Sequence, residues 1–130
     1  MTATTASELV VVDSSGWLEF FTNDSKADLF APYLEGEDSL VLVPAVVIYE
    51  VRKILLLNQS RTLADAFYCD VLRRTVAPFD EVLAMHSAEL SVTHKLSMAD
   101  AIIYATASHF RAKLITSDSH FANLPGVVLL

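Results

Sequence analysis

The stretch Leu-Ser-Met-Ala-Asp-Ala-Ile-Ile-Tyr-Ala-Thr-Ala, residues 96–107, combines a strong helix pattern with one charge in an unusual place. Ser97 is a good N-cap, and small or apolar residues follow it, which predicts a helix. The charge is Asp100, whose neighbours one turn on are Ile103 and Tyr104, so it borders a face that we expect to be packed. A carboxylate there needs a proton, a hydrogen bond or a cation. It either completes a capping box with Ser97 or belongs to a site.

Composition limits the protein class. The chain has 130 residues, 53% of them hydrophobic, and a formal net charge of −7. The length suits one domain, residues 1–130, and no apolar run approaches the roughly 20 residues that span a bilayer. Residues 1–7 suggest a frayed start without a secretory signal, and the single Cys69, expected to be a buried small hydrophobe, suits a cytoplasmic location. The acidity argues against broad attraction to nucleic acid or membranes, but a local basic patch can still guide a phosphate chain.

Short apolar runs alternate with helical patterns along the whole chain. Residues 8–13 form a β-branched run that ends in an acid, typical of a strand buried on both faces. Further strands are predicted at 39–43, 75–78, 113–116 and 127–130, and helices at 14–21, 25–34, 44–57, 62–74, 81–94 and 96–107, with a short turn at 119–122. This alternation predicts an α/β domain with a mainly parallel sheet.

Two acids follow predicted strands directly. Asp13 ends the first strand, and Asp118 comes just after the strand at 113–116. In open parallel sheets, sites form outside the carboxyl ends of the strands, where the strand order reverses. Each residue could instead cap the helix that follows it. Both interpretations stay open.

Glu50 lies two turns into a predicted helix, beyond any capping position. Its helical neighbours on the same stripe are apolar: Val47, Val51 and Ile54. A lone ionised glutamate there would be costly. The alternative is a buried ion pair with Arg52, Lys53 or Arg111. Arg52 and Lys53 project elsewhere on the same helix, which weakens that alternative for them.

These four acids point to metal chemistry if they converge. Four neighbouring carboxylates cannot all stay ionised without cations. Oxygen ligands with few histidines suit Mg²⁺ or Mn²⁺ rather than zinc. Such ions activate water and stabilise an in-line phosphoryl displacement, so a phosphodiester is the natural substrate.

Four segments taken in order resemble the PIN domain, and more narrowly the VapC toxins of type II toxin–antitoxin systems. The segments are VVVDSS at 10–15, VPAVVIYEV at 43–51, the stretch at 96–107 and LITSDSHF at 114–121. The resemblance covers nearly the whole chain. It implies a PIN-like (Rossmann-like) three-layer α/β sandwich with a five-stranded, mainly parallel sheet in the order 3-2-1-4-5.

The resemblance also implies an activity and partners. The family's four acids fall on Asp13, Glu50, Asp100 and Asp118. Ser14 and Thr116 match two hydroxyl positions of the family. The expected activity is that of an Mg²⁺- or Mn²⁺-dependent endoribonuclease, which leaves a 3′-hydroxyl and a 5′-phosphate on its RNA substrate. The expected partners are a second copy, forming a homodimer, and a cognate antitoxin that inserts a segment into the active-site groove.

Several residues carry two interpretations. Ser117 stands where relatives often have arginine, so phosphate binding must come from elsewhere. His120 either contacts a water or the substrate at the site, or is a solvent-facing residue on a short turn. Arg73 and Arg74 either contact phosphate or simply stand at a helix C-terminus, where positive charge is favourable. The helix at 46–57 is apolar around most of its circumference, which suggests burial in a dimer or beneath an antitoxin helix.

Two other functions compete with the nuclease. One is a catalytically silent module on the same fold that binds or regulates within a complex, which the acidic charge and the missing arginine favour. The other is a phosphatase of the haloacid dehalogenase type. That chemistry needs a second aspartate two residues after the first, and Ser15 occupies this place, so we discount it.

Overall fold

A computed structural model describes residues 8–130 and has the predicted alternation of strands and helices. The elements are β1 (Val10–Val12), α1 (Ser14–Phe21), α2 (Ala27–Leu34), η2 (Asp38–Leu40), β2 (Leu42–Pro44), α3 (Ala45–Asn58), α4 (Arg61–Val71), β3 (Thr75–Ala77), α5 (Glu81–His94), α6 (Met98–His109), β4 (Lys113–Thr116), η3 (Ser119–Phe121) and β5 (Val127–Leu129). The α/β class is therefore confirmed, with most boundaries within two residues of the predicted ones.

The strands are parallel and form two hydrogen-bonded groups. In one, β4 lies between β1 and β5; in the other, β2 pairs with β3. A single parallel bridge between Val10 and Val41 joins them. The strands thus lie in the expected order 3-2-1-4-5, but only that single bridge joins β2 to β1, so they do not form one continuous five-stranded sheet. One reason is that η2 occupies Asp38–Leu40, where the sequence predicts the start of a strand, so β2 begins only at Leu42.

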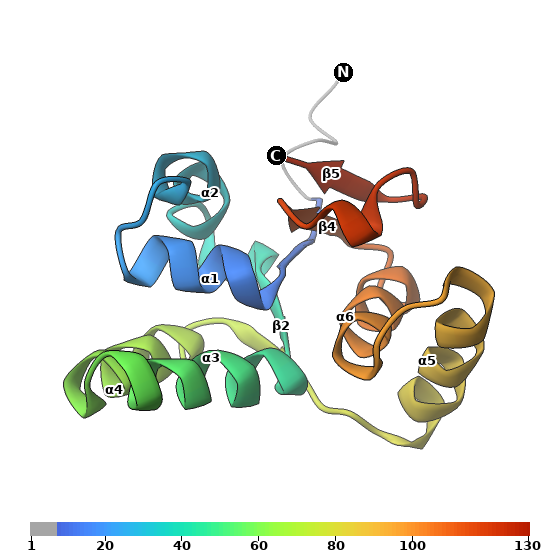
Figure 1. Cartoon of the computed structure of the whole chain (residues 1–130), viewed down its shortest axis with the longest axis horizontal. Coiled ribbons are helices and arrows are strands. Elements are labelled where there is room, and N and C mark those ends of the chain that lie inside the picture. The colour runs from blue at the N-terminus through green and yellow to red at the C-terminus, as the bar shows by residue number, and fades with distance from the viewer. Residues whose placement is uncertain (1–7) are drawn as a thin grey trace.

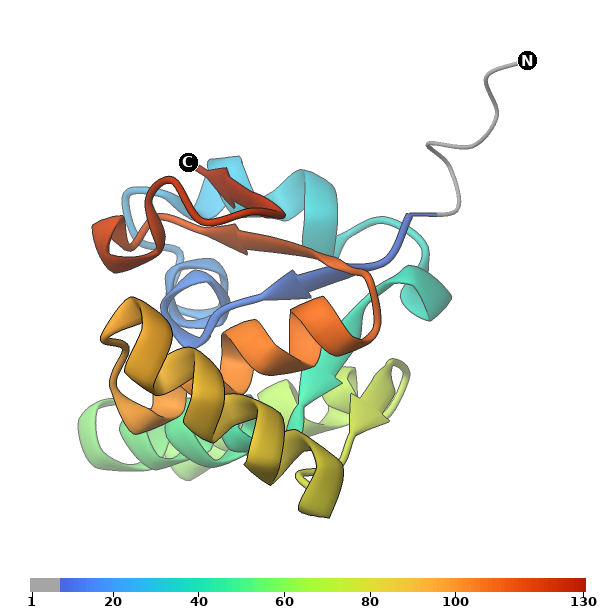
Figure 2. The same cartoon turned by 90° about the vertical axis from the view of Figure 1, so that its right-hand side faces the viewer.

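Helices cover both faces of the strands, which gives the expected three layers. In Figure 1, α1 to α4 lie to the left of the central strands and α5 and α6 to the right. Figure 2 shows α5 and α6 in front of the strands. Right-handed crossovers explain this division. The chain steps one way from β1 to β3 and then returns to β4, so the helices before and after β3 fall on opposite faces.

The core brings α1 unusually close to its neighbours. Trp17, Phe30 and Phe67 are completely buried between the helices before β3. A Cβ on Gly16 would lie 2.6 Å from side-chain atoms of both Phe30 and Val12. Only glycine therefore allows α1 to pack this tightly against β1 and α2, and this packing sets the position of the residues just after β1.

Cys69 is exposed, so the expectation of burial is wrong. Helix α4 turns Ala64, Phe67 and Val71 into the core, at helical spacing, and Cys69 falls off that stripe. The expectation about residues 1–7 lies outside the described residues. Within the described part, no helix is both long enough and apolar enough to cross a bilayer.

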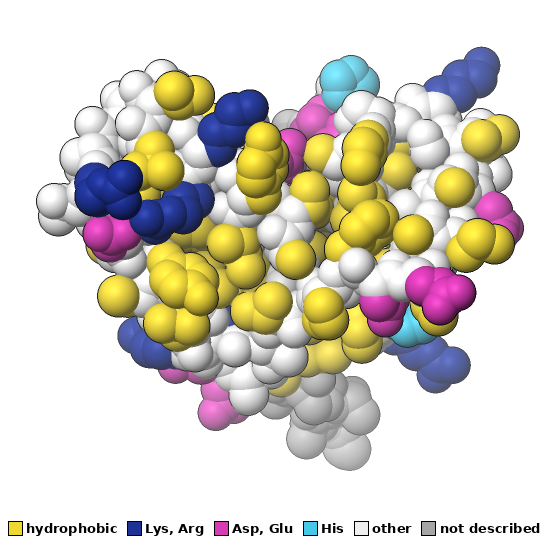
Figure 3. Space-filling model, turned by 90° about the horizontal axis from the view of Figure 1, so that it is seen from below, with side chains coloured by type: hydrophobic (Ala, Val, Ile, Leu, Met, Phe, Trp, Pro, Cys, Tyr) yellow, Lys and Arg dark blue, Asp and Glu magenta, His cyan; other side chains and the backbone are white. Residues whose placement is uncertain are grey.

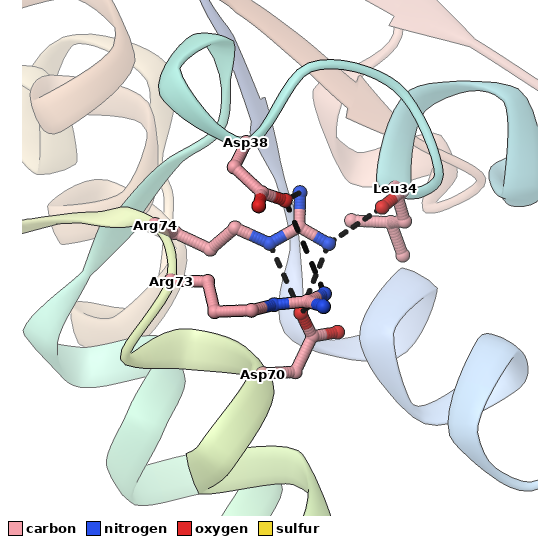
Figure 4. Close-up of polar contacts among 5 residues, drawn as sticks. All are labelled: Leu34, Asp38, Asp70, Arg73 and Arg74. Atoms are coloured by element: carbon pink, nitrogen blue, oxygen red, sulfur yellow. Dashed lines mark hydrogen bonds and ion pairs between the residues drawn. The ribbon is translucent and has the colours of Figure 1, made fainter.

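Arg74 is a structural residue rather than a surface cation. Its side chain is 1% exposed and contacts Asp70 and Asp38, as Figure 4 shows. Its Nε donates to Asp70 Oδ1 at 3.1 Å, and Nη2 donates to the carbonyl of Leu34 at 2.5 Å. Arg73, with a 60% exposed side chain, pairs with the same Asp70 from outside. Arg74 therefore ties the end of α4 to the end of α2 and to η2, and is not free to contact phosphate.

Candidate metal centre

The pairing of β1 with β4 places Asp13 beside Thr116. Val12 is in register with Ile115, and the backbone N–H of Asp13 donates to the Ile115 carbonyl at 3.2 Å. One residue further along both strands, the Thr116 hydroxyl donates to Asp13 Oδ2 at 2.6 Å. The two strand ends are thus joined by a hydrogen bond between buried side chains.

Asp13 also caps the helix that follows it. Its Oδ1 accepts from the backbone N–H of Gly16 at 2.9 Å, and Oδ2 accepts from the Ser15 hydroxyl at 3.0 Å. Burial raises the pKa of Asp13, and the charge of Asp118 raises it further, against the lowering effect of the hydrogen bonds. Asp13 is therefore both a cap and a carboxylate facing another acid, so the two interpretations are compatible.

Asp118 belongs to the same chain of contacts. Its backbone N–H donates to Thr116 Oγ1 at 2.9 Å, so Thr116 bridges Asp13 and Asp118. Asp118 also caps η3, because its Oδ1 accepts from the backbone N–H of His120 at 2.9 Å. The ring Nδ1 of His120 lies 3.0 Å from that oxygen, although the side chain is 78% exposed. The His120 side chain thus faces solvent and also contacts the carboxylate of Asp118.

Glu50 reaches the site from α3. Its Oε1 accepts from the Ser14 hydroxyl at 2.6 Å. The alternative of a buried ion pair is absent from the described residues: Arg52 instead pairs with Asp65 at 2.9 Å, and Arg111 is exposed. Glu50 is half-buried at the edge of the apolar stripe. Its geometry therefore points to a site rather than to charge neutralisation by a neighbouring cation.

Asp100 lies in the first turn of α6 and forms no capping box. The side chain of its N-cap residue, Ser97, makes no capping hydrogen bond. Burial raises the pKa of Asp100, and the charges of Asp118 and Glu50 raise it further, while Ser97 and His120 lower it. Ile103 and Tyr104 are buried, as expected for the adjoining face.

One pocket of about 220 Å³ is lined by all four predicted acids. Its lining consists of Asp13, Ser14, Ser15, Leu18, Glu50, Ile54, Asp100, Ile103 and Asp118. Each acid comes from a different part of the fold: the end of β1, α3, α6 and the end of β4. Asp100, Asp118 and His120 also offer ligand atoms that lie within 4.8 Å of one another.

The donor set fits a hard divalent cation. Within the described residues, the pocket lining contains carboxylates and hydroxyls but no lysine or arginine. Burial raises the pKa values of Asp13 and Asp100, and neighbouring carboxylates raise them further, so a bound cation would favour their ionised forms. Carboxylate oxygens in this number suit Mg²⁺ or Mn²⁺ rather than a softer metal.

Comparison with known proteins assigns the chain to a family. The PIN domain family model matches residues 10–127. The chain belongs to the PIN domain family. No curated protein sequence matches it.

Solved PIN-domain structures superpose over almost the full length. A toxin–antitoxin complex from Klebsiella pneumoniae is 25% identical, with a TM-score of 0.76, over 92% of this chain and 95% of that chain. VapC20 from Mycobacterium tuberculosis is 18% identical, with a TM-score of 0.76, over 91% and 96%. DNA-bound VapBC from Salmonella typhimurium is 15% identical, with a TM-score of 0.74, over 95% and 97%. The PIN fold expected from the four segments is confirmed.

Ser15 is a residue of this pocket that was not predicted from the sequence. It is the third donor to Asp13, next to Gly16 and Thr116. The available signal was the run Asp13-Ser14-Ser15 after a buried strand, because hydroxyls just after a cap aspartate can bond back to it. The two serines have different partners: the Ser15 hydroxyl donates to Asp13, and the Ser14 hydroxyl donates to Glu50.

Proposed function

We propose that this PIN-domain protein is an Mg²⁺- or Mn²⁺-dependent endoribonuclease and the toxin of a type II toxin–antitoxin pair. The observation that carries the proposal is the convergence of four carboxylates from four elements on one pocket. The Klebsiella pneumoniae relative, described as a toxin–antitoxin complex, supports the biological role. The VapC20 neighbour, described as a toxin that cleaves the sarcin–ricin loop, supports the chemistry.

The roles of the residues follow from their contacts. Asp13, Glu50, Asp100 and Asp118 would hold the divalent ions. When bound, these ions supply positive charge that activates water and stabilises the transferring phosphoryl group. Thr116 and Ser15 fix the orientation of Asp13, and Ser14 fixes that of Glu50, as outer partners orient ligands in metal sites. His120 stands at the exposed rim, within reach of an incoming strand.

Exposed apolar side chains on α3 support the proposed protein partners. Tyr49 and Leu57 are 64% and 72% exposed, and both line a shallow apolar pocket of about 390 Å³ flanked by Arg52 and Lys53. Figure 3 shows hydrophobic side chains gathered on the face that carries α3 and α4, with basic side chains beside them. Such a patch on a soluble domain is typical of an interface. We assign it to protein contacts, with a second copy or with the antitoxin.

We also propose that the functional unit is a single PIN domain spanning residues 1–130 and acting in the cytoplasm. The lone thiol of Cys69 supports a reducing compartment, because it allows no internal disulfide.

The direct test is cleavage of RNA by the purified protein with Mn²⁺, followed on a denaturing gel. We expect the wild type to cut RNA and Asp100→Asn to lose most of this activity. Removal of an outer partner of a metal ligand costs about 10- to 100-fold in activity, and loss of a ligand should cost more. Asp28→Asn is the matched control, because it makes the same charge change at an exposed position on α2. Equal activity of wild type and Asp100→Asn would refute the nuclease. Inactive wild type that still binds its protein partner would favour the silent binding module.

A further inference from the structure

A second pocket adjoins the carboxylate pocket and differs from it in charge. It has a volume of about 350 Å³ and is lined by His94, Lys95, Leu96, Ser97, Asp100 and His120. Asp100 lines both pockets, so the two are neighbours. The first pocket presents carboxylates and hydroxyls, whereas the second presents an ammonium group, two imidazoles and a hydroxyl.

Lys95 is the notable residue of this second pocket. Among the described residues that line the two pockets, it alone carries a permanent positive charge. It makes no ion pair within residues 8–130, in contrast to Arg52, Arg73 and Arg74. Its ammonium group is therefore available to a ligand.

The backbone holds Lys95 at this place. Lys95 ends α5 with φ of 57°, the left-handed conformation in which glycine or asparagine is favoured. The next residue, Leu96, is buried, and its carbonyl accepts from the Ser91 hydroxyl at 2.7 Å. The connection between α5 and α6 is thus anchored on both sides, and Lys95 projects from a defined point rather than from a loose loop.

The pocket contains further polar side chains beside Lys95. The Ser97 side chain makes no capping hydrogen bond with the backbone and lies beside Asp100, whose pKa it lowers. The His94 ring packs edge-on against Tyr104, with centroids 5.8 Å apart, which fixes its plane. Together with Lys95, these groups form a set of hydrogen-bond donors suited to phosphate oxygens.

We propose that this second pocket binds a phosphate of the RNA strand adjacent to the scissile phosphate, and that Lys95 is its main contact. The inference rests on the proposed nuclease function, because the ions held at the first pocket would offset the charge of Asp100. A strand whose scissile phosphate lies over the carboxylates passes Asp100 and His120 into this pocket. In a chain of net charge −7, a cation at this point supplies the local attraction that the overall charge does not.

The test compares Lys95→Ala with wild type in steady-state cleavage of a short oligoribonucleotide. We expect KM to rise about tenfold with kcat nearly unchanged, because a contact away from the reacting atoms contributes uniform binding. The slope of log affinity against log salt should fall by about 0.7, the value for one phosphate contact on a single strand. Lys95→Arg should restore binding. Alanine and lysine both carry a Cβ, so the left-handed backbone costs the two residues alike, and thermal melting checks this.

The matched control is Lys113→Ala. Lys113 lines a different pocket, at the opposite end of β4 from Asp118, together with Arg111. Its removal should leave KM unchanged. A substrate with a neutral methylphosphonate next to the scissile phosphate adds a second readout: wild type should lose affinity on it, and Lys95→Ala should not distinguish it from normal RNA.

The outcomes separate this inference from the proposed function. If wild type cuts RNA and Lys95→Ala has an unchanged KM, the phosphate subsite is refuted and the nuclease stands. If wild type does not cut, fluorescence anisotropy of the same oligonucleotide decides, and equal affinities of wild type and Lys95→Ala refute the subsite. If Lys95→Ala weakens binding of a protein partner but not of RNA, the pocket recognises an acidic protein segment and the inference is wrong.

Discussion

The hydroxyl of Thr116 lies 2.6 Å from Oδ2 of Asp13, although 103 positions separate the two residues in the sequence. The same hydroxyl oxygen accepts from the backbone N–H of Asp118 at 2.9 Å. Thr116 therefore holds two of the four acids at a fixed separation. The parallel pairing of β1 with β4 creates this contact, because Val12 is in register with Ile115.

Replacing Thr116 with valine should weaken both stability and activity. The change keeps the shape but leaves an oxygen of Asp13 short of a donor and the N–H of Asp118 without its acceptor. Unsatisfied buried groups cost about 1–3 kcal/mol, which chemical denaturation would measure. Thr116→Ser keeps the hydroxyl and should retain most of the activity. If valine and serine behave alike, the hydroxyl does not organise the site.

Two adjacent arginines should respond very differently to substitution. Arg74→Met removes the partner of Asp70 and of the Leu34 carbonyl inside the protein, and breaking a buried pair costs about 3–5 kcal/mol. Arg73→Met removes an exposed partner of Asp70 and should barely change the melting temperature. Thermal melting of the two variants measures the contrast. Similar melting temperatures would mean that Arg74 is not the structural tie we describe.

The stability of the metal-free protein should rise as the pH falls through the raised pKa values of Asp13 and Asp100 towards 3.8. The pKa values of Asp13 and Asp100 are raised above the ordinary 3.8, so between 3.8 and the raised values the native state binds more protons than the unfolded state. In that window, the free energy of unfolding falls as the pH rises. Above the raised pKa values, the full free-energy cost of ionising the two buried carboxyls is present. Saturating Mn²⁺ should reduce this trend, because divalent ions bind the deprotonated carboxylates.

Asp100→Asn isolates one part of that effect. The variant removes a carboxylate that repels Asp118 and Glu50, so without metal it should melt above wild type at neutral pH and depend less on pH. Asp28→Asn, at an exposed position, should show neither change. A lower melting point for metal-free Asp100→Asn would contradict the electrostatic account.

Much of the fold and the grouping of the acids follow from local patterns. Asp13 and Asp118 end buried β-branched runs, and parallel strands bring their carboxyl ends to one edge of the sheet. Asp100 and Glu50 were recognisable because each is a charge beside an apolar helical face. The helix boundaries also agree well, since caps such as Asp80 act through neighbours close in sequence.

The features that escaped prediction depend on contacts between distant segments. The burial of Arg74 depends on the carbonyl of Leu34, 40 positions away, which no local pattern reveals. The partner of Glu50 is Ser14, 36 positions away, and no pattern near Glu50 in the sequence indicates this contact. The place of His94 in a pocket beside Asp100 follows only from the packing of α5 on α6.

The central claim is that the four acids form one divalent-ion site, and calorimetric titration of Mn²⁺ into metal-free protein tests it most directly. Glu50→Gln is the informative variant, because it removes one charge from α3 while keeping an oxygen that can accept from Ser14. We expect wild type to bind Mn²⁺ and Glu50→Gln to bind it at least about tenfold more weakly, because loss of an outer partner of a metal ligand alone costs about 10- to 100-fold. Wild type that binds no Mn²⁺, or a Glu50→Gln variant with undiminished affinity, would contradict the account.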